Sequence, residues 1–114
     1  MINKKELPVI NKVFNETTSR EEEIINKVIS ILVEKLNPKK ILLFGSRAKG
    51  ENTRHADFDF AVDHRKPDLN DVRTIKEEIE IIAGLYKVDL VFLENVDAKF
   101  KEIVLKTGKI VYEQ

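Results

Sequence analysis

Residues 40–62 read KILLFGSRAKGENTRHADFDFAV and contain two short apolar runs joined by a polar connection. The first run ends at Gly45, and the second opens with Asp57 and Asp59, one residue apart. Both runs have the length of a β-strand, and the connection has no room for a crossover helix. We therefore expect two neighbouring antiparallel strands. Small and acidic residues would then meet at one end of the pair.

The two aspartates predict a site because side chains alternate between the faces of a strand. Asp57 and Asp59 would share one face, and Phe58, Phe60 and Val62 the other. Neighbouring carboxylates repel each other unless a cation, a shared proton or full solvation relieves them. A divalent metal ion is one such relief, especially beside a turn that binds phosphate. The alternative is that both aspartates only decorate the solvated face of a half-buried sheet.

A third aspartate, Asp89, stands inside the apolar run Val88–Val91. A carboxylate in such surroundings costs free energy of desolvation unless it reaches a cation or a hydrogen-bonding partner. A position in the same sheet would bring Asp89 to the other two aspartates. Alternatively, it lies at the solvated end of an edge strand.

The turn after the first strand has the composition of a phosphate-binding turn. Gly45 allows a tight backbone turn, and the hydroxyl of Ser46 adds a hydrogen-bond donor. Arg47, Lys49 and Arg54 supply positive charge locally. With the three aspartates, this predicts phosphoryl or nucleotidyl transfer on two divalent metal ions, in which the third aspartate is both a ligand and a general base.

The remaining periodicity predicts a single α/β domain over residues 1–114, a mixed β-sheet covered by helices. Asp68 or Asn70, and Asp97, are candidate N-caps, and Gly84 is a candidate left-handed helix end. Residues 1–17 predict an irregular lead-in. The expected helices are 20–36, 69–83 and 97–106, and the expected strands are 40–44, 57–63, 87–93 and 109–112.

Composition excludes several classes of function. The chain has 20 basic residues (lysine and arginine) and 20 acidic residues (aspartate and glutamate), so its formal net charge is zero. This balance disfavours a nucleic-acid duplex as partner. The absence of cysteine excludes disulfides, thiolate zinc sites and cysteine nucleophiles. No apolar run approaches the ~20 residues of a membrane span, and no signal peptide is evident. The default expectation is a soluble cytoplasmic protein.

These motifs resemble the polymerase-β-like nucleotidyltransferase superfamily, most closely its minimal nucleotidyltransferase group. The resemblance runs from about Ile24 to Tyr112 and rests on residues 45–50, 56–60 and 88–91. It implies ATP as substrate with Mg²⁺, Gly45 and Ser46 at the phosphates, Asp57 and Asp59 as metal ligands, and Asp89 completing the triad.

Many minimal members of this superfamily resemble antitoxins that silence a helical HEPN toxin by transferring AMP to a tyrosine. A chain of this size lacks an acceptor-binding domain, so we expect the hydroxyl substrate on another polypeptide, in a hetero-oligomer or homo-oligomer. Two alternatives remain: an idle antitoxin that neutralises its partner by contact alone, and a subunit of a small-molecule, for example antibiotic, nucleotidyltransferase.

Overall fold

The computed structural model describes residues 19–45 and 57–114. Expectations for residues 1–18 and for the segment 46–56 lie outside this part. The elements appear in the predicted order, each within one residue of its expected limits: α1 (Ser19–Leu36), β1 (Lys40–Phe44), β2 (Phe58–Val62), α2 (Leu69–Ala83), β3 (Val88–Phe92), α3 (Ala98–Thr107) and β4 (Lys109–Glu113).

The four strands form one mixed sheet in the order β3-β2-β1-β4. β1 pairs antiparallel with β2, as the short connection predicts, and also with β4, while β2 and β3 are parallel. β1 is therefore central, and its residues Ile41, Leu42 and Leu43 are buried, as its apolar sequence predicts. Because β1 is antiparallel to β2 and β3 is parallel to β2, the end of β1 lies at the same end of the sheet as the starts of β2 and β3.

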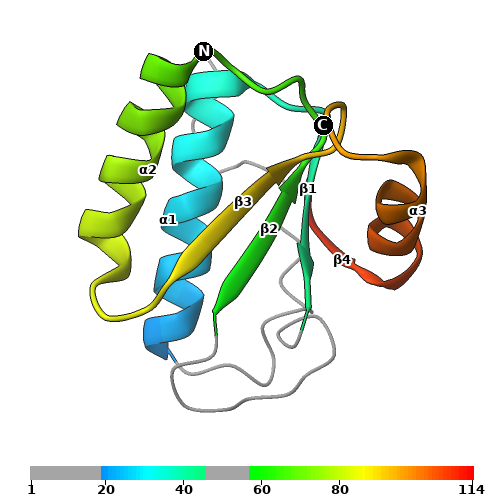
Figure 1. Cartoon of the computed structure of the whole chain (residues 1–114). Coiled ribbons are helices and arrows are strands. Elements are labelled where there is room, and N and C mark those ends of the chain that lie inside the picture. The colour runs from blue at the N-terminus through cyan, green and yellow to red at the C-terminus, as the bar shows by residue number, and fades with distance from the viewer. Residues whose placement is uncertain (1–18, 46–56) are drawn as a thin grey trace.

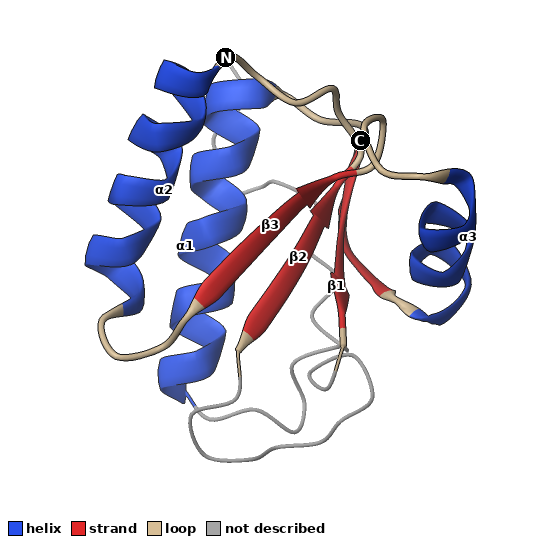
Figure 2. Cartoon of the chain, in the orientation of Figure 1, coloured by secondary structure: helices blue, strands red, loops and turns tan. Residues whose placement is uncertain are grey.

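Helices cover both faces of the sheet (Figures 1 and 2): α1 and α2 lie side by side on one face, and α3 lies on the other. The larger core joins α1 and α2 to Phe58, Phe60 and Val62 of β2, which is the face predicted from the alternation. A smaller core joins Leu42 and Ala61 to Val104 of α3. This is the expected α/β arrangement, with three layers.

Local signals explain the helix limits. Asp68 and Asp97 are the N-caps of α2 and α3, and their carboxylates accept hydrogen bonds from the backbone N–H groups of Asp71 (2.9 Å) and Phe100 (2.8 Å). Gly84 ends α2 with a φ of 63°, as expected, but its ψ of −116° lies outside the left-handed helical region. In the described part of the chain, every helix is too short or too polar to cross a lipid bilayer.

Candidate active site

The sheet register brings the described aspartates to one end of one face. Asp59 of β2 lies opposite Phe44 of β1 on one side and opposite Asp89 of β3 on the other. Asp57 precedes β2 by one residue and shares its face with Asp59 by the alternation of the strand. The sequence predicts that a position in the same sheet would bring Asp89 to the other aspartates. The register confirms this for Asp59, which is the direct neighbour of Asp89 in the ladder.

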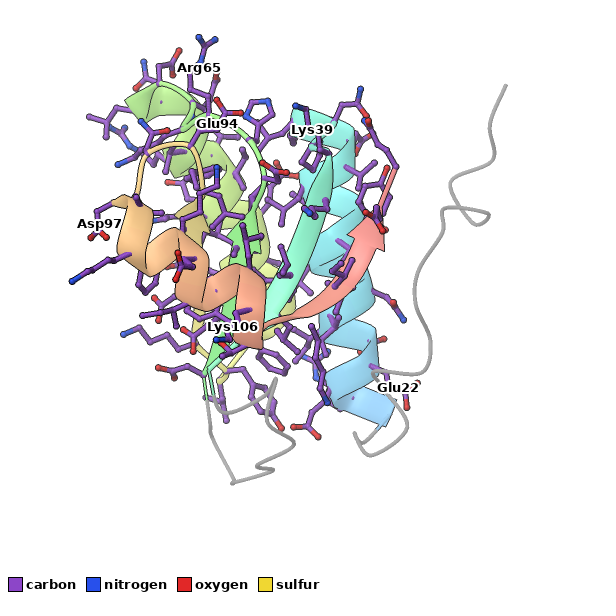
Figure 3. The ribbon with its side chains drawn as sticks, turned by 90° about the vertical axis from the view of Figure 1, so that its right-hand side faces the viewer. Glu22, Lys39, Arg65, Glu94, Asp97 and Lys106 are labelled. Atoms are coloured by element: carbon purple, nitrogen blue, oxygen red, sulfur yellow. The ribbon has the colours of Figure 1, made fainter. Side chains whose placement is uncertain are left out.

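This face of the sheet also carries α3, but the helix covers only part of it. Phe100 of α3 packs edge-on against Phe44, with ring centroids 5.9 Å apart, and Val104 packs against Leu42 and Ala61. In Figure 3, which looks onto this face, Asp97 and Lys106 mark the two ends of α3. Asp57, Asp59 and Asp89 lie outside the buried cluster under α3 and are each only partly buried.

Gly45 closes the site from the end of β1. Its φ of 77° lies in the left-handed region, which favours glycine. A Cβ at this position would lie 2.6 Å from Oδ2 of Asp59, closer than such atoms can approach. The glycine is therefore required twice, once by its backbone conformation and once by the carboxylate that packs against it. Ser46 and Arg47, the other predicted phosphate-binding residues, lie outside the described residues.

The electrostatics of the site centre on Asp59. Partial burial raises the pKa of its carboxyl, and the negative charges of Asp89 and Asp57 raise it further. Lys87 acts in the opposite direction and lowers the pKa of Asp59. Lys87 is not among the residues predicted for the site, although it immediately precedes β3 and the period of two places it on the same face as Asp89.

The three aspartates suit a hard divalent cation, because carboxylate oxygens are the ligands that such a cation prefers. A cation would also relieve the repulsion that Asp89 and Asp57 exert on Asp59. Residues 19–45 and 57–114 contain no group of three or more acidic, histidine or cysteine side chains gathered closely enough to hold an ion alone. Mg²⁺ does not need such a cage, since one or two carboxylates and the phosphates of a substrate commonly bind it. The aspartates therefore fit a metal ion that arrives with a nucleotide.

Comparison with known proteins gives consistent matches. The family model described as "Polymerase beta, Nucleotidyltransferase" matches residues 26–114. A relative from Methanocaldococcus jannaschii, named "Putative protein adenylyltransferase MJ1379", is 37% identical over 84 residues, which cover 71% of this chain and 83% of the relative.

Solved structures agree in fold. A chain of a toxin-antitoxin crystal structure with AMP-PNP has a TM-score of 0.67 and 27% identity, over 78% of this chain and 73% of that one. A chain from a tri-AMPylated Shewanella oneidensis HEPN toxin in complex with its MNT antitoxin has a TM-score of 0.62 and 24% identity, over 83% of this chain and 73% of that one. The second likeness shows the fold alone.

Proposed function

Because the chain belongs to the polymerase beta nucleotidyltransferase family and is a nucleotidyltransferase, we propose that it transfers AMP from ATP to a protein hydroxyl. The observation that carries this proposal is the in-register pair of Asp59 and Asp89 beside Gly45 on a partly open face. A relative named as a protein adenylyltransferase and a neighbour that contains a nucleotide analogue support the choice of substrate.

In the proposed mechanism, the glycine turn receives the phosphates and the aspartates serve the transfer. Gly45 allows the backbone to approach the nucleotide closely, together with Ser46 and Arg47. Asp57, Asp59 and Asp89 would hold Mg²⁺, two ions in all, together with the phosphates of the nucleotide. Bound Mg²⁺ would supply positive charge that offsets the charge on the phosphates and on the attacking oxygen.

Asp89 also serves as the general base. The acceptor oxygen forms a bond to the α-phosphorus of ATP as the bond to the pyrophosphate oxygen breaks. The proton of the acceptor hydroxyl passes to the carboxylate of Asp89. This role suits Asp89 because it lies beside Asp59 on β3, which is an edge of the sheet in the described part of the chain.

The acceptor is a tyrosine of a helical HEPN-type toxin, and the chain acts as the antitoxin of the pair. The fold neighbours include a toxin-antitoxin complex with AMP-PNP and an AMPylated HEPN toxin with its antitoxin.

The test mixes the purified chain with labelled ATP, Mg²⁺ and the folded product of the adjacent reading frame. We expect label on a partner tyrosine, and loss of label with Asp57→Asn. The thermal midpoint of that variant should be unchanged or raised, because one repulsive charge near Asp59 is removed. No transfer to a folded partner would refute the proposal, and equal neutralisation by wild type and an Asp57→Asn, Asp59→Asn double variant would favour an idle antitoxin.

A further inference from the structure

β3 is an edge of the four-stranded sheet in the described part of the chain, and the pattern of its ladder shows which backbone groups face outward. At one end, the N–H of Phe58 donates to the carbonyl of Lys87 (2.9 Å). At the other end, the N–H of Leu93 donates to the carbonyl of Val62 (2.9 Å). In a parallel pair, alternate residues bond to the neighbour. The backbone N–H and C=O groups of Asp89 and Val91 therefore point towards β2. The same groups of Val88 and Leu90 point away from the sheet.

A groove follows this open edge. Two hollows of about 470 and 220 Å³ share Lys76 and Leu90 and together run along β3 beside α2. Ile79, Ala83 and Leu85 line the larger hollow from the side of α2, and Val88 lines it from the strand. Leu85 is 91% exposed, which leaves an apolar surface next to the outward-pointing backbone groups of β3.

The edge and the groove together fit one kind of occupant, an extended protein segment. Such a segment pairs its own backbone with Val88 and Leu90, as in recognition by strand addition. A helix cannot do so, because its backbone groups are already bonded within the helix. Lys87 lies two residues before Asp89 and on the same face, so it favours an acidic residue two positions from the segment residue that is level with Asp89, whichever way the segment runs.

We propose that the acceptor segment of the partner adds to β3 as a fifth strand, with its hydroxyl-bearing residue level with Asp89. This inference rests on the proposed function and specifies how its acceptor is held. Neighbouring strands lie about 4.8 Å apart and their opposite side chains share a face, so the hydroxyl residue would stand on the face that carries Asp59 and Asp89. The residues before and after it would point into the groove beside α2.

The recognition motif that follows is a hydroxyl residue flanked on both sides by apolar residues, with acidic residues beyond them. We test it with a synthetic peptide that contains Glu-Val-Tyr-Val-Glu. A control peptide of the same composition contains Val-Glu-Tyr-Glu-Val, which places charge rather than valine in the groove. The two peptides separate strand addition in this register from simple attraction between charges.

The first measurement is amide hydrogen exchange in the full chain with and without the peptide. We expect the amides of Val88 and Leu90 to exchange about tenfold more slowly at saturation. The amides of Asp89 and Val91, which already bond to β2, should change little. The control peptide should protect none of them. Unchanged exchange at Val88 and Leu90 with saturating peptide would overturn the proposal.

The second measurement is transfer of label from ATP to the peptide, compared between two variants of matched exposure. Leu85→Asp places a charge in the groove and should lower transfer about tenfold, the scale of one lost apolar contact. Ile81→Asp alters a residue of α2 that is 83% exposed but does not line the groove, and should stay within about twofold of wild type. Equal behaviour of the two variants would refute the assignment.

The two measurements distinguish this inference from the proposed function. Protection of Val88 and Leu90 without any transfer would uphold the docking edge and refute the transferase activity on such an acceptor. Transfer without protection would uphold the activity and overturn the docking edge. Protection in the absence of peptide, together with a dimer in sedimentation analysis, would show that the edge joins two copies of this chain and would also overturn the proposal.

Discussion

Gly45→Ala probes the contact between the end of β1 and the site. Two costs add at this position. A non-glycine residue at a φ of 77° costs about 1 kcal/mol. The new Cβ would lie 2.6 Å from Oδ2 of Asp59, so the carboxylate must rotate away, at about 1 kcal/mol for a side chain forced from its rotamer. The expected loss is about 2 kcal/mol of unfolding free energy, or about 8 °C in the thermal midpoint for a domain of this size.

Gly84→Ala is a second glycine substitution at a positive φ, 63°, away from the site. The nearest neighbour to a new Cβ at Gly84 is Nη2 of Arg20 at 3.5 Å, which is an ordinary contact. Because the ψ of Gly84, −116°, lies outside the left-handed helical region, the conformational cost is about 1 to 3 kcal/mol, and none of it should depend on the carboxylate of Asp59. Thermal unfolding followed by circular dichroism measures the midpoints of both variants, each with and without Asp59→Ala.

A double-mutant cycle with Asp59→Ala completes the test. In the Asp59→Ala background, Gly45→Ala should cost only about 1 kcal/mol, because the carboxylate that it meets is gone, whereas the cost of Gly84→Ala should be the same in both backgrounds. In the wild-type background, Gly45→Ala should also lower adenylyl transfer at least about tenfold, since it displaces a proposed metal ligand. An equal cost of Gly45→Ala with and without the Asp59 carboxylate would refute the contact.

Three further predictions concern charge, capping and the core. The pKa of Asp59 in the folded state lies above its ordinary value of 3.8. The folded state therefore loses stability as the pH rises from 3.8 through this raised pKa. Asp59→Asn should therefore unfold at a higher temperature than wild type at pH 7, and this advantage should shrink as the pH falls towards 3.8. Asp97→Ala should cost about 1 kcal/mol in urea unfolding by removing the N-cap of α3, whereas Asp97→Asn should retain most of that stability. Phe58→Ala should cost about 3 to 5 kcal/mol, because the ring is fully buried and packs against Phe60 and Tyr86; a loss below about 1 kcal/mol would contradict this packing.

Most of the fold follows from signals that lie within a few residues of one another. Alternation predicts that Phe58 and Phe60 face the core, and the aspartate caps predict the starts of α2 and α3. The antiparallel pairing of β1 and β2 follows from the length of their connection. The ψ of Gly84 did not follow, because the path of the chain after α2 depends on where β3 joins the sheet and not on the local sequence.

The complete site could not be predicted from local sequence alone, because it depends on how β3 pairs with β2. The shared face of Asp57 and Asp59 follows from the period of two, but the position of Asp89 depends on β3 pairing in parallel with β2 in one register. A slip of one residue would have turned Asp89 to the opposite face. The apolar neighbours of Asp89 indicated that the carboxylate needed a partner, and the register supplies Asp59.

The structure also separates two aspartates that the sequence treats as equivalent. Asp59 lies within the ladder, between Phe44 and Asp89 and against Gly45, so burial and two neighbouring carboxylates act on it together to raise its pKa. Asp57 precedes β2 and lies outside the ladder. Asp59 is therefore the carboxylate at which added positive charge gains most, and Lys87 already supplies a part of it. A ligand that brings a divalent cation to this face should stabilise the wild type more than Asp59→Asn, so the position of Asp59, rather than the number of aspartates, would determine the proposed metal binding.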